Sequence, residues 1–263
     1  MILNILANKN ILHQTKELNK SFQEATPFSH VVIDNFLERN FADLLHDETR
    51  SILKEINVSN DFTQKNKIAC NDWSKFGRTT FDFISFLNSS IFVNYLESIT
   101  SFKGLITDPL LEGGGIHSVS NNGFLKMHSD FNWHNYLKIF RRINILFYLN
   151  KNWKESMKGE LILSSKNIKD YVSIKPLFNR LVIFNTNDKT FHGHPEKLNF
   201  PEEYPRTSIA IYYYTRNRPI SEIARFKSSN TKYIPFSKKD INTTNISLKK
   251  KIGYYLRRFT PFG

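Results

Sequence analysis

A series of short strand-like segments that begins around Gly113-Gly114-Gly115 limits the fold more than any other feature of this sequence. Each segment is rich in β-branched and aromatic residues and is bounded by Asn, Gly, Lys or Pro, as strands joined by turns are. The segments are residues 116–119, 124–127, 143–149, 160–163, 171–174, 180–184 and 208–215. Such a series is typical of an antiparallel barrel or sandwich rather than of a parallel α/β sheet.

The first third of the chain mixes helical and strand-like patterns. Apolar spacing predicts helices at 11–25, 41–56 and 89–99, with Ser90 as the candidate N-cap of the third, and a short strand at 31–33. A chain of 263 residues can bury a substantial core and fits one domain with an appended segment. We therefore expect a mainly β fold with flanking helices.

The formal net charge of +13 is concentrated at the C-terminal end. From Arg225 to Gly263 there are ten Lys or Arg residues against the single acid Asp240, which gives +9 and leaves +4 for the other 224 residues. The chain is also rich in Asn, Lys and Ile, a bias that an AT-rich genome produces without selection for a partner. The charge therefore does not indicate a nucleic-acid partner.

Several localisation signals are missing from the sequence. The single cysteine, Cys70, excludes an intramolecular disulfide. The apolar start from Met1 to Ala7 is too short for a secretory signal and lacks a basic lead-in. No run approaches the ~18–20 apolar residues of a membrane-spanning helix. We expect a cytoplasmic protein.

The first chemical motif is His128-Ser129-Asp130. Residues two apart on a strand project from the same face, so His128 and Asp130 can converge on one ion. A third ligand has to come from a neighbouring strand or loop, and Phe191-His192-Gly193-His194 offers two candidates; we favour His192 over His194 because it follows directly on a strand and its turn. Two imidazoles and one carboxylate that leave three positions open are the arrangement of non-haem Fe(II) oxygenases.

A second group of residues suits the co-substrate of such an oxygenase, 2-oxoglutarate. Its distal carboxylate needs a charged anchor, and Arg206, which begins an apolar strand, can grip it through two parallel hydrogen bonds. Ser208 shares the face of Arg206, and Tyr148 can add a further hydroxyl donor. A surface salt bridge for Arg206 and simple core packing for Tyr148 are the alternatives.

These residues together resemble the prolyl-4-hydroxylase-like branch of the 2-oxoglutarate/Fe(II) oxygenases, including the hypoxia-sensing prolyl hydroxylases. The resemblance covers roughly Gly113 to Arg218, and residues 27–37 resemble the first strand of that branch. The motifs that carry it are Phe124-Leu-Lys-Met-His-Ser-Asp130, Tyr148-Leu-Asn-Lys-Asn-Trp153, Gly159-Glu-Leu161, Ile174-Lys-Pro176, Asn179-Arg-Leu-Val-Ile-Phe184, His192-Gly193 and Arg206-Thr-Ser208.

The resemblance implies iron on His128, Asp130 and His192, and 2-oxoglutarate on Arg206 with Tyr148 assisting. It implies Fe(II), 2-oxoglutarate and O2 as cofactors, with ascorbate as a candidate reductant, and hydroxylation of a C–H bond with release of succinate and CO2. The fold it implies is a double-stranded β-helix, or jelly roll, supported by N-terminal helices. We divide the chain into a support region at 1–110, an oxygenase core at 111–218 and a basic extension at 219–263, forming one domain overall. The family usually has two glycines where this chain has Gly159-Glu160, which bears on the rim of the pocket.

The substrate that the resemblance implies is a peptide, with a peptidyl proline as the family's usual case, or a small or glycan-linked molecule. Our candidates for contacting it are Trp133, Arg142 and Arg78; rim packing or a solvated charge is the alternative for each. Other residues that could line the mouth are Asn132, His134, Arg141, Trp73 and Phe76.

The C-terminal extension contains a helical apolar stripe. Leu248, Ile252, Tyr255 and Phe259 recur at helical spacing, with basic residues largely off the stripe. A helix at 248–259 could lie on an anionic membrane surface or bind an acidic partner, or pack back on the enzyme. Two further function classes stay open beside the hydroxylase: a catalytically silent jelly-roll module that binds metal, and a membrane- or partner-binding protein that acts through this basic tail.

Overall fold

The computed structural model describes residues 14–56, 64–165, 170–201, 203–222, 227 and 229–236. The chain divides into two units, Met1–Tyr233 and Ile234–Gly263. All of the helices and strands below belong to the first unit. The helical stripe predicted at 248–259 lies outside the described residues. Among the described residues, no helix has the length and apolar character needed to cross a membrane.

Strands paired in antiparallel fashion make up most of the first unit. The sheet has twelve strands, of which eight follow the order β1-β9-β6-β11-β4-β10-β7-β8, while β2 and β12 pair with β4, β3 with β11, and β5 with β6. The bounds are β1 His30–Ile33, β2 Gln64–Cys70, β3 Ile106–Thr107, β4 Gly115–Ser129, β5 Trp133–His134, β6 Ile139–Tyr148, β7 Leu161–Ser165, β8 Tyr171–Ile174, β9 Arg180–Asn185, β10 Thr190–His194, β11 Arg206–Thr215 and β12 Lys232–Tyr233.

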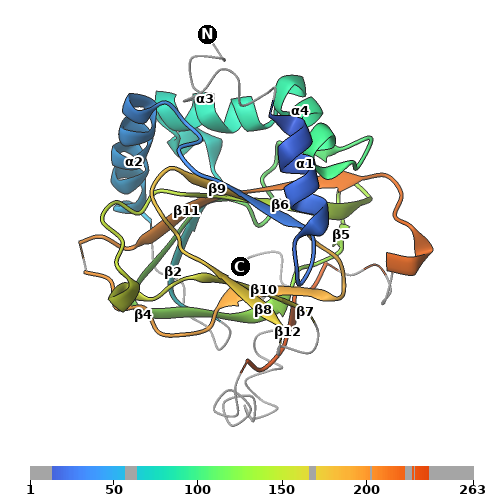
Figure 1. Cartoon of the computed structure of the whole chain (residues 1–263). Helices are drawn as coiled ribbons and strands as arrows, with labels where there is room; N and C mark the ends of the chain where they lie inside the picture. Colours follow the sequence, from blue (N-terminus) through green and yellow to red (C-terminus); the bar gives the residue numbers. More distant parts are fainter. Residues whose placement is uncertain are drawn as a thin grey trace. The chain divides into compact units, whose positions relative to one another are not determined.

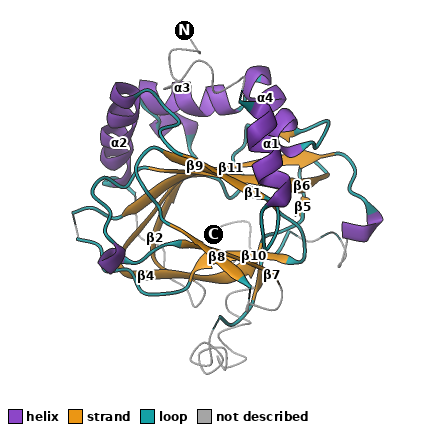
Figure 2. Cartoon of the chain, viewed as in Figure 1, coloured by secondary structure: helices purple, strands orange, loops and turns teal. Residues whose placement is uncertain are grey.

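The sheet curls over on itself into two facing layers (Figure 1). One layer holds β1, β9, β6 and β11, and the other holds β4, β10, β7 and β8, which Figure 2 shows as the upper and lower bands of strands. This curled antiparallel arrangement is that of a jelly roll and confirms the predicted fold class. The layers face each other across an interior that both can line with side chains.

The helices lie on the outer face of the layer that contains β9 and β11 (Figure 2). They are α1 Thr15–Glu24, α2 Arg39–Leu53, α3 Arg78–Leu87 and α4 Ser90–Thr100, with short 3-10 turns η3 Trp73–Lys75, η4 Glu155–Met157 and η5 Ile220–Glu222. The Glu38 side chain caps α2 by accepting a hydrogen bond from the backbone N–H of Phe41 at 3.0 Å. Ser89, rather than the predicted Ser90, caps α4 by accepting from the N–H of Phe92.

The main apolar core lies between these helices and the sheet. Phe83 on α3 and Phe147 on β6 are both fully buried, and their ring centroids are 4.9 Å apart. On β11, Ile209, Ile211 and Tyr213 belong to this core, and the Tyr213 hydroxyl donates to the carbonyl of Leu87 at 2.6 Å. Alternation along the strand therefore turns Arg206 and Ser208 to the opposite face, into the space between the layers.

The structure differs from the sequence-based expectations in several elements. The helix α3, which begins at Arg78, was not predicted, and β2 and β10 were not predicted as strands. The segments 116–119 and 124–127 form one long strand, β4. Its pairing with β2 shifts register between Lys65 and Lys67, and Asn122 on β4 has a positive φ of 59°. Such irregularities break the period-2 pattern from which a single strand would be recognised.

Candidate metal centre

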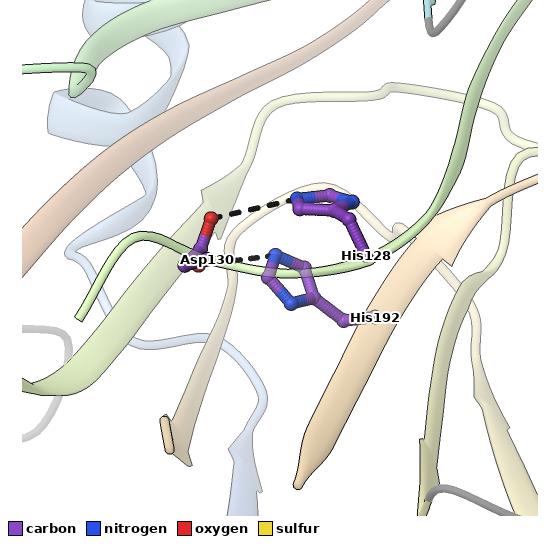
Figure 3. Close-up of side chains that lie close together, drawn as sticks. All are labelled: His128, Asp130 and His192. Atoms are coloured by element: carbon purple, nitrogen blue, oxygen red, sulfur yellow. Dashed lines mark ion pairs between the residues drawn. The ribbon is translucent and has the colours of Figure 1, made fainter. Parts of the chain in front are cut away.

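His128, Asp130 and His192 come together at the end of β4 (Figure 3). Strands β4 and β10 are antiparallel neighbours, and His192 stands directly opposite His128 in the register. Side chains that face each other in this way share one side of the sheet. Asp130 follows β4 by one residue. One ligand atom from each of the three residues lies within 4.8 Å of the others, as one bound ion would require.

The two imidazoles turn their Nε2 atoms to the aspartate. Nε2 of His128 is 3.5 Å from Oδ1 of Asp130, and Nε2 of His192 is 3.5 Å from Oδ2. Nδ1 of His128 is 2.8 Å from the carbonyl oxygen of Lys126. A carbonyl only accepts, so Nδ1 carries the proton and Nε2 keeps a lone pair directed at the centre of the cluster. A ligand histidine is oriented in this way in most metal sites, so the residues present fit a divalent ion.

Asp130 is held from its other side by two residues of β6. Nδ2 of Asn144 donates to Oδ2 of Asp130 at 2.7 Å, and Nη2 of Arg141 lies 2.9 Å from the same oxygen. The arginine contact is a close ion pair rather than an aligned hydrogen bond, since Nη2 has no hydrogen-bond partner among the described residues. Nε of Arg141 also donates to Oδ1 of Asn144 at 2.9 Å. Arg141 and Asn144 therefore fix the Asp130 carboxylate relative to both histidines.

Electrostatics keep Asp130 and His192 in the protonation states that a metal needs. Burial alone would raise the pKa of Asp130, but the Arg141 guanidinium and the imidazoles of His192 and His128 outweigh it and hold the pKa well below its usual range. Burial, reinforced by His128, lowers the pKa of His192 from 6.5 to about 3. At neutral pH the cluster consists of a carboxylate and a neutral His192 imidazole, both of which can bind a cation.

Arg141 is an almost fully buried cation whose place is set by aromatic rings. Only 1% of its surface is exposed, and its guanidinium carbon lies 3.3 Å from the ring centroid of Tyr212 and 4.5 Å from that of Phe131. This stacking lets the side chain remain buried while its charge faces Asp130. From its sequence position Arg141 was expected only at the mouth, whereas its contact with Asp130 and its stacking on Tyr212 depend on the folded sheet.

Arg206 begins β11 and is also buried, with 5% of its surface exposed. Its Nε donates to the carbonyl of Gly159 at 2.7 Å, and its Nη2 donates to the hydroxyl of Tyr148 at 3.1 Å. Ser208 stands opposite Tyr148 in the register of β11 and β6. No carboxylate among the described residues forms an ion pair with Arg206. A buried guanidinium without a counterion indicates a binding position for an anion.

Gly159 and Tyr148 shape the surroundings of this arginine. Gly159 has a positive φ of 87°, and a Cβ placed there would lie 3.0 Å from Cδ of Arg206. The first residue of the Gly159-Glu160 pair therefore has to be glycine to let the arginine pass. Burial raises the pKa of Tyr148, and this effect is larger than the opposing effect of the Arg206 charge, which lowers the pKa. Because the tyrosine oxygen accepts from Arg206, its own proton remains available for an anion.

Apolar side chains connect the arginine to the metal cluster. Tyr148 and Phe184 belong to one buried cluster, which the aliphatic residues Leu161, Leu163, Ile174 and Val182 complete. The Phe184 ring centroid is 5.0 Å from that of His192. A molecule that extends from the histidines to Arg206 would thus lie against apolar walls with charged groups at both ends, as a small dicarboxylate requires.

Of the two candidate histidines, only His192 joins the cluster found among the described residues. His194 lies on the same strand, opposite Leu125, after a register shift between the two histidines. It is buried, and its Nδ1 has no hydrogen-bond partner in the described part of the chain. Burial and the positive charge of Arg206 lower the pKa of His194 well below its usual value.

The structure does not bring Arg142 and Arg78 to the metal cluster. The guanidinium of Arg142 pairs with Glu222 and lies over the ring of Phe102 at 4.3 Å. Arg78 is 77% exposed at the start of α3 and forms an ion pair with Asp82 at 2.7 Å. Helix α3 covers the outer face of the sheet (Figure 1), away from the interior where the histidines lie.

Trp133, the third candidate for contacting substrate, remains near the cluster. It lies on β5, three residues after Asp130, and its ring packs at 4.8 Å from that of Phe140. The amine of Lys227 lies 3.9 Å from the Trp133 ring centroid. Trp133 is therefore held by Phe140 and Lys227 in the segment that follows Asp130.

The other residues proposed for the mouth have structural partners. Nδ2 of Asn132 donates to Asp188 at 2.9 Å. His134 is fully buried, with Nε2 3.1 Å from Glu112 and 3.5 Å from Asp108. Trp73 and Phe76 pack on each other at 5.6 Å between ring centroids and lie against the helical core. These contacts hold loops in place.

Comparison with known proteins agrees with this site. Residues 114–214 match a family model described as the 2OG-Fe(II) oxygenase superfamily. The matched range runs from the start of β4 almost to the end of β11, so it includes the metal cluster, Tyr148 and Arg206.

Solved structures share the fold at low sequence identity. A prolyl hydroxylase from Trichoplax adhaerens, in complex with a hypoxia inducible factor peptide fragment, is 18% identical with a TM-score of 0.56 and covers 77% of this chain and 91% of its own. A prolyl-4-hydroxylase from Pseudomonas putida is 16% identical with a TM-score of 0.53, covering 76% and 99%. HygX from Streptomyces hygroscopicus, with nickel and 2-oxoglutarate bound, is 11% identical with a TM-score of 0.51, covering 85% and 96%.

At these identities the solved structures show the fold alone. Residues 114–214 of this chain match the 2OG-Fe(II) oxygenase superfamily, an oxidoreductase family that uses Fe(II), 2-oxoglutarate and O2.

Proposed function

We propose that this protein is a dioxygenase that hydroxylates an unactivated C–H bond with Fe(II), 2-oxoglutarate and O2. One oxygen atom of O2 enters the product as hydroxyl and the other enters succinate, while 2-oxoglutarate loses CO2. The observation that carries the proposal is the buried charge of Arg206, which pairs with no described carboxylate. It lies beside Tyr148 and is joined by apolar residues to the cluster of His128, Asp130 and His192. A purely structural metal site would need no such anchor.

His128, Asp130 and His192 are the residues that would hold the iron. Iron and 2-oxoglutarate, when bound, supply the oxidising chemistry, and the protein supplies the geometry. Three protein ligands leave positions for the co-substrate and O2. Asp130 as the carboxylate ligand favours hydroxylation over halogenation, because halogenases open that position for a halide by carrying Gly or Ala there.

Arg206 and Tyr148 would bind the distal carboxylate of 2-oxoglutarate. Arg206 uses one N–H on Gly159 and one on Tyr148, so three of its five N–H groups remain for the ligand. Ser208 faces the same interior and can add a donor. The apolar residues between Tyr148 and Phe184 would exclude water along the carbon chain of the co-substrate.

The acceptor would enter on the side of the metal cluster where Trp133 and Tyr233 lie. Strand β12 pairs with the end of β4, and the Tyr233 ring centroid is 5.5 Å from that of His128. We propose a peptide or a small molecule as acceptor. The peptide alternative is supported by the shared fold of the Trichoplax adhaerens prolyl hydroxylase, which is solved with a peptide fragment.

Turnover without an added acceptor tests the reaction class. Protein loaded with Fe(II) and 2-oxoglutarate under anaerobic conditions should release succinate slowly when O2 is admitted. His128→Ala and Asp130→Ala should abolish the release, while His30→Gln, a histidine on β1 outside the cluster, should leave it unchanged. Mass spectrometry of a peptide and metabolite panel should then find a product heavier by one oxygen atom. Failure of the wild-type protein to form succinate with any acceptor would rule out the proposed reaction.

A further inference from the structure

His194 is a buried imidazole that the metal cluster does not use. It is 4% exposed, and its Nδ1 has no hydrogen-bond partner among the described residues. Buried polar groups in native proteins are nearly always hydrogen-bonded, so an unpartnered one points to a missing ligand. Nδ1 of His128 is held by the carbonyl of Lys126, but among the described residues no carbonyl holds Nδ1 of His194 in this way.

The position of His194 explains which ligand it would meet. His192 and His194 are two apart on β10, so both project between the layers of the sheet, toward β4. The strongest electrostatic effects on His194 come from Arg206 and then from Lys67, ahead of the two histidines of the cluster. Strand β10 pairs with β7 as far as Gly193 opposite Ile162, and Gly159, whose carbonyl accepts a hydrogen bond from Arg206, lies three residues before Ile162. The imidazole therefore lies on the side of the arginine and faces the same interior. A positive charge on the same side as a buried imidazole makes a site in which an anion is favoured.

We propose that His194 is a third side chain that binds the distal carboxylate of 2-oxoglutarate, beside Arg206 and Tyr148. The inference rests on the proposed function and adds a residue that determines co-substrate specificity. An imidazole has an N–H that a carboxylate can accept, and a carboxylate takes up to about four hydrogen bonds, so there is room for it beside the other two donors. His194 then contributes to 2-oxoglutarate binding and not to metal binding.

A binding experiment without turnover separates these roles. The protein is loaded with Mn(II), which occupies the iron site but does not support turnover. It is then titrated by calorimetry with 2-oxoglutarate and with 2-oxopentanoate. The second ligand has the same carbon chain but a methyl group in place of the distal carboxylate. The variants are His194→Leu, which cannot form hydrogen bonds, and His194→Gln, which retains an N–H donor.

The inference predicts that His194→Leu binds 2-oxoglutarate about 10- to 100-fold more weakly, as expected for a hydrogen bond to a charged group. Its affinity for 2-oxopentanoate and for Mn(II) should stay within about threefold of the wild type, and His194→Gln should recover most of the lost affinity. If His194→Leu does not fold, His194→Met provides the same comparison.

Two results would overturn the assignment of His194. Unchanged affinity of His194→Leu for 2-oxoglutarate would do so, as would an equal loss of affinity for both ligands, because the effect would then not involve the distal carboxylate. A wild-type protein that binds Mn(II) but no 2-oxoglutarate would instead contradict the proposed function itself. A loss of Mn(II) binding in His194→Leu, with His192→Leu still binding Mn(II), would show that the metal ligand is His194.

Discussion

Replacing Arg206 with Gln is the most direct test of how this protein holds its co-substrate. The substitution removes the buried charge and retains an amide that can still donate to Gly159 or Tyr148. The surrounding sheet should therefore remain folded, and the change should act on the ligand. Because no described carboxylate pairs with Arg206, removing its charge leaves no protein anion unpaired.

The magnitude follows from the loss of a buried, hydrogen-bonded charge pair, which costs about 2–5 kcal/mol of binding free energy, or at least ~30-fold in Kd. A ligand present at 100 times its Kd stabilises the folded chain by about 2.7 kcal/mol. For a chain of this size each kcal/mol moves Tm by about 2–4 °C, so the wild type should gain about 5–11 °C. At the same concentration Arg206→Gln would bind only weakly and gain no more than about 3 °C.

The assay is thermal unfolding of Mn(II)-loaded protein with and without 2-oxoglutarate. Arg39→Gln is the matched control, because Arg39 is 70% exposed on α2 and pairs with Asp43. The control should show the full wild-type shift. If Arg206→Gln retained a shift of 5 °C or more, the distal carboxylate would be bound elsewhere, and the assignment of Arg206 would be wrong.

Four further predictions follow from the same contacts. Asp130→Ala should abolish Mn(II) binding measured by calorimetry, since it removes a ligand, and an affinity within threefold of the wild type would exclude Asp130 from the site. Asn144→Leu should weaken Mn(II) binding about 10- to 100-fold, because it removes the hydrogen bond that orients the ligand carboxylate; an unchanged affinity would show that Arg141 orients it alone. His192 has a pKa of about 3 in the folded chain against 6.5 ordinarily, so the stability that it contributes is complete above pH 6.5 and is lost as pH falls toward about 3. The Tm of the metal-free protein should therefore fall over this pH window, and it should fall less steeply in His192→Gln. Equal slopes for the two proteins would contradict the burial of a neutral imidazole. Phe83→Ala should cost about 3–5 kcal/mol in urea unfolding, because it empties the core against Phe147, and a loss below ~1 kcal/mol would mean that this contact contributes little.

Much of the candidate site could be predicted because its residues are close in sequence and carry distinctive chemistry. His128 and Asp130 are two apart, which places both at one end of a strand, and Arg206 is a rare charge at the start of an apolar strand. Period-2 alternation along β6 puts Asn144 on the same face as Tyr148. What alternation could not supply was the partner of Asn144, since contacts between separate strands depend on register.

The choice between His192 and His194 shows the same limit. Both histidines are on one face of β10, so their spacing does not distinguish them. The pairing of β10 with β4 sets His192 opposite His128 and His194 opposite Leu125, and only that pairing places one histidine at the cluster and the other outside it.

Arg141 and Arg142 show most clearly what sequence and tertiary structure each determine. Period-2 alternation from Asn144 would turn Arg142 into the interior, and Arg142 was a candidate for contacting the substrate. The pairing of β6 with β11 is irregular, because Tyr213 pairs with Ile143 and Tyr214 with Arg141, which leaves Arg142 as an extra residue in a bulge.

This bulge reverses the faces of β6 to which Arg141 and Arg142 belong. Arg141 reaches Asp130, and Arg142 reaches Glu222 instead. The sequence by itself determined the strand-rich fold, the histidine–aspartate motif and the anchor for a dicarboxylate, because these depend on local spacing and residue type. Which histidine joins the cluster and which arginine faces it were decided by strand register, which is set only when the whole sheet closes over its core.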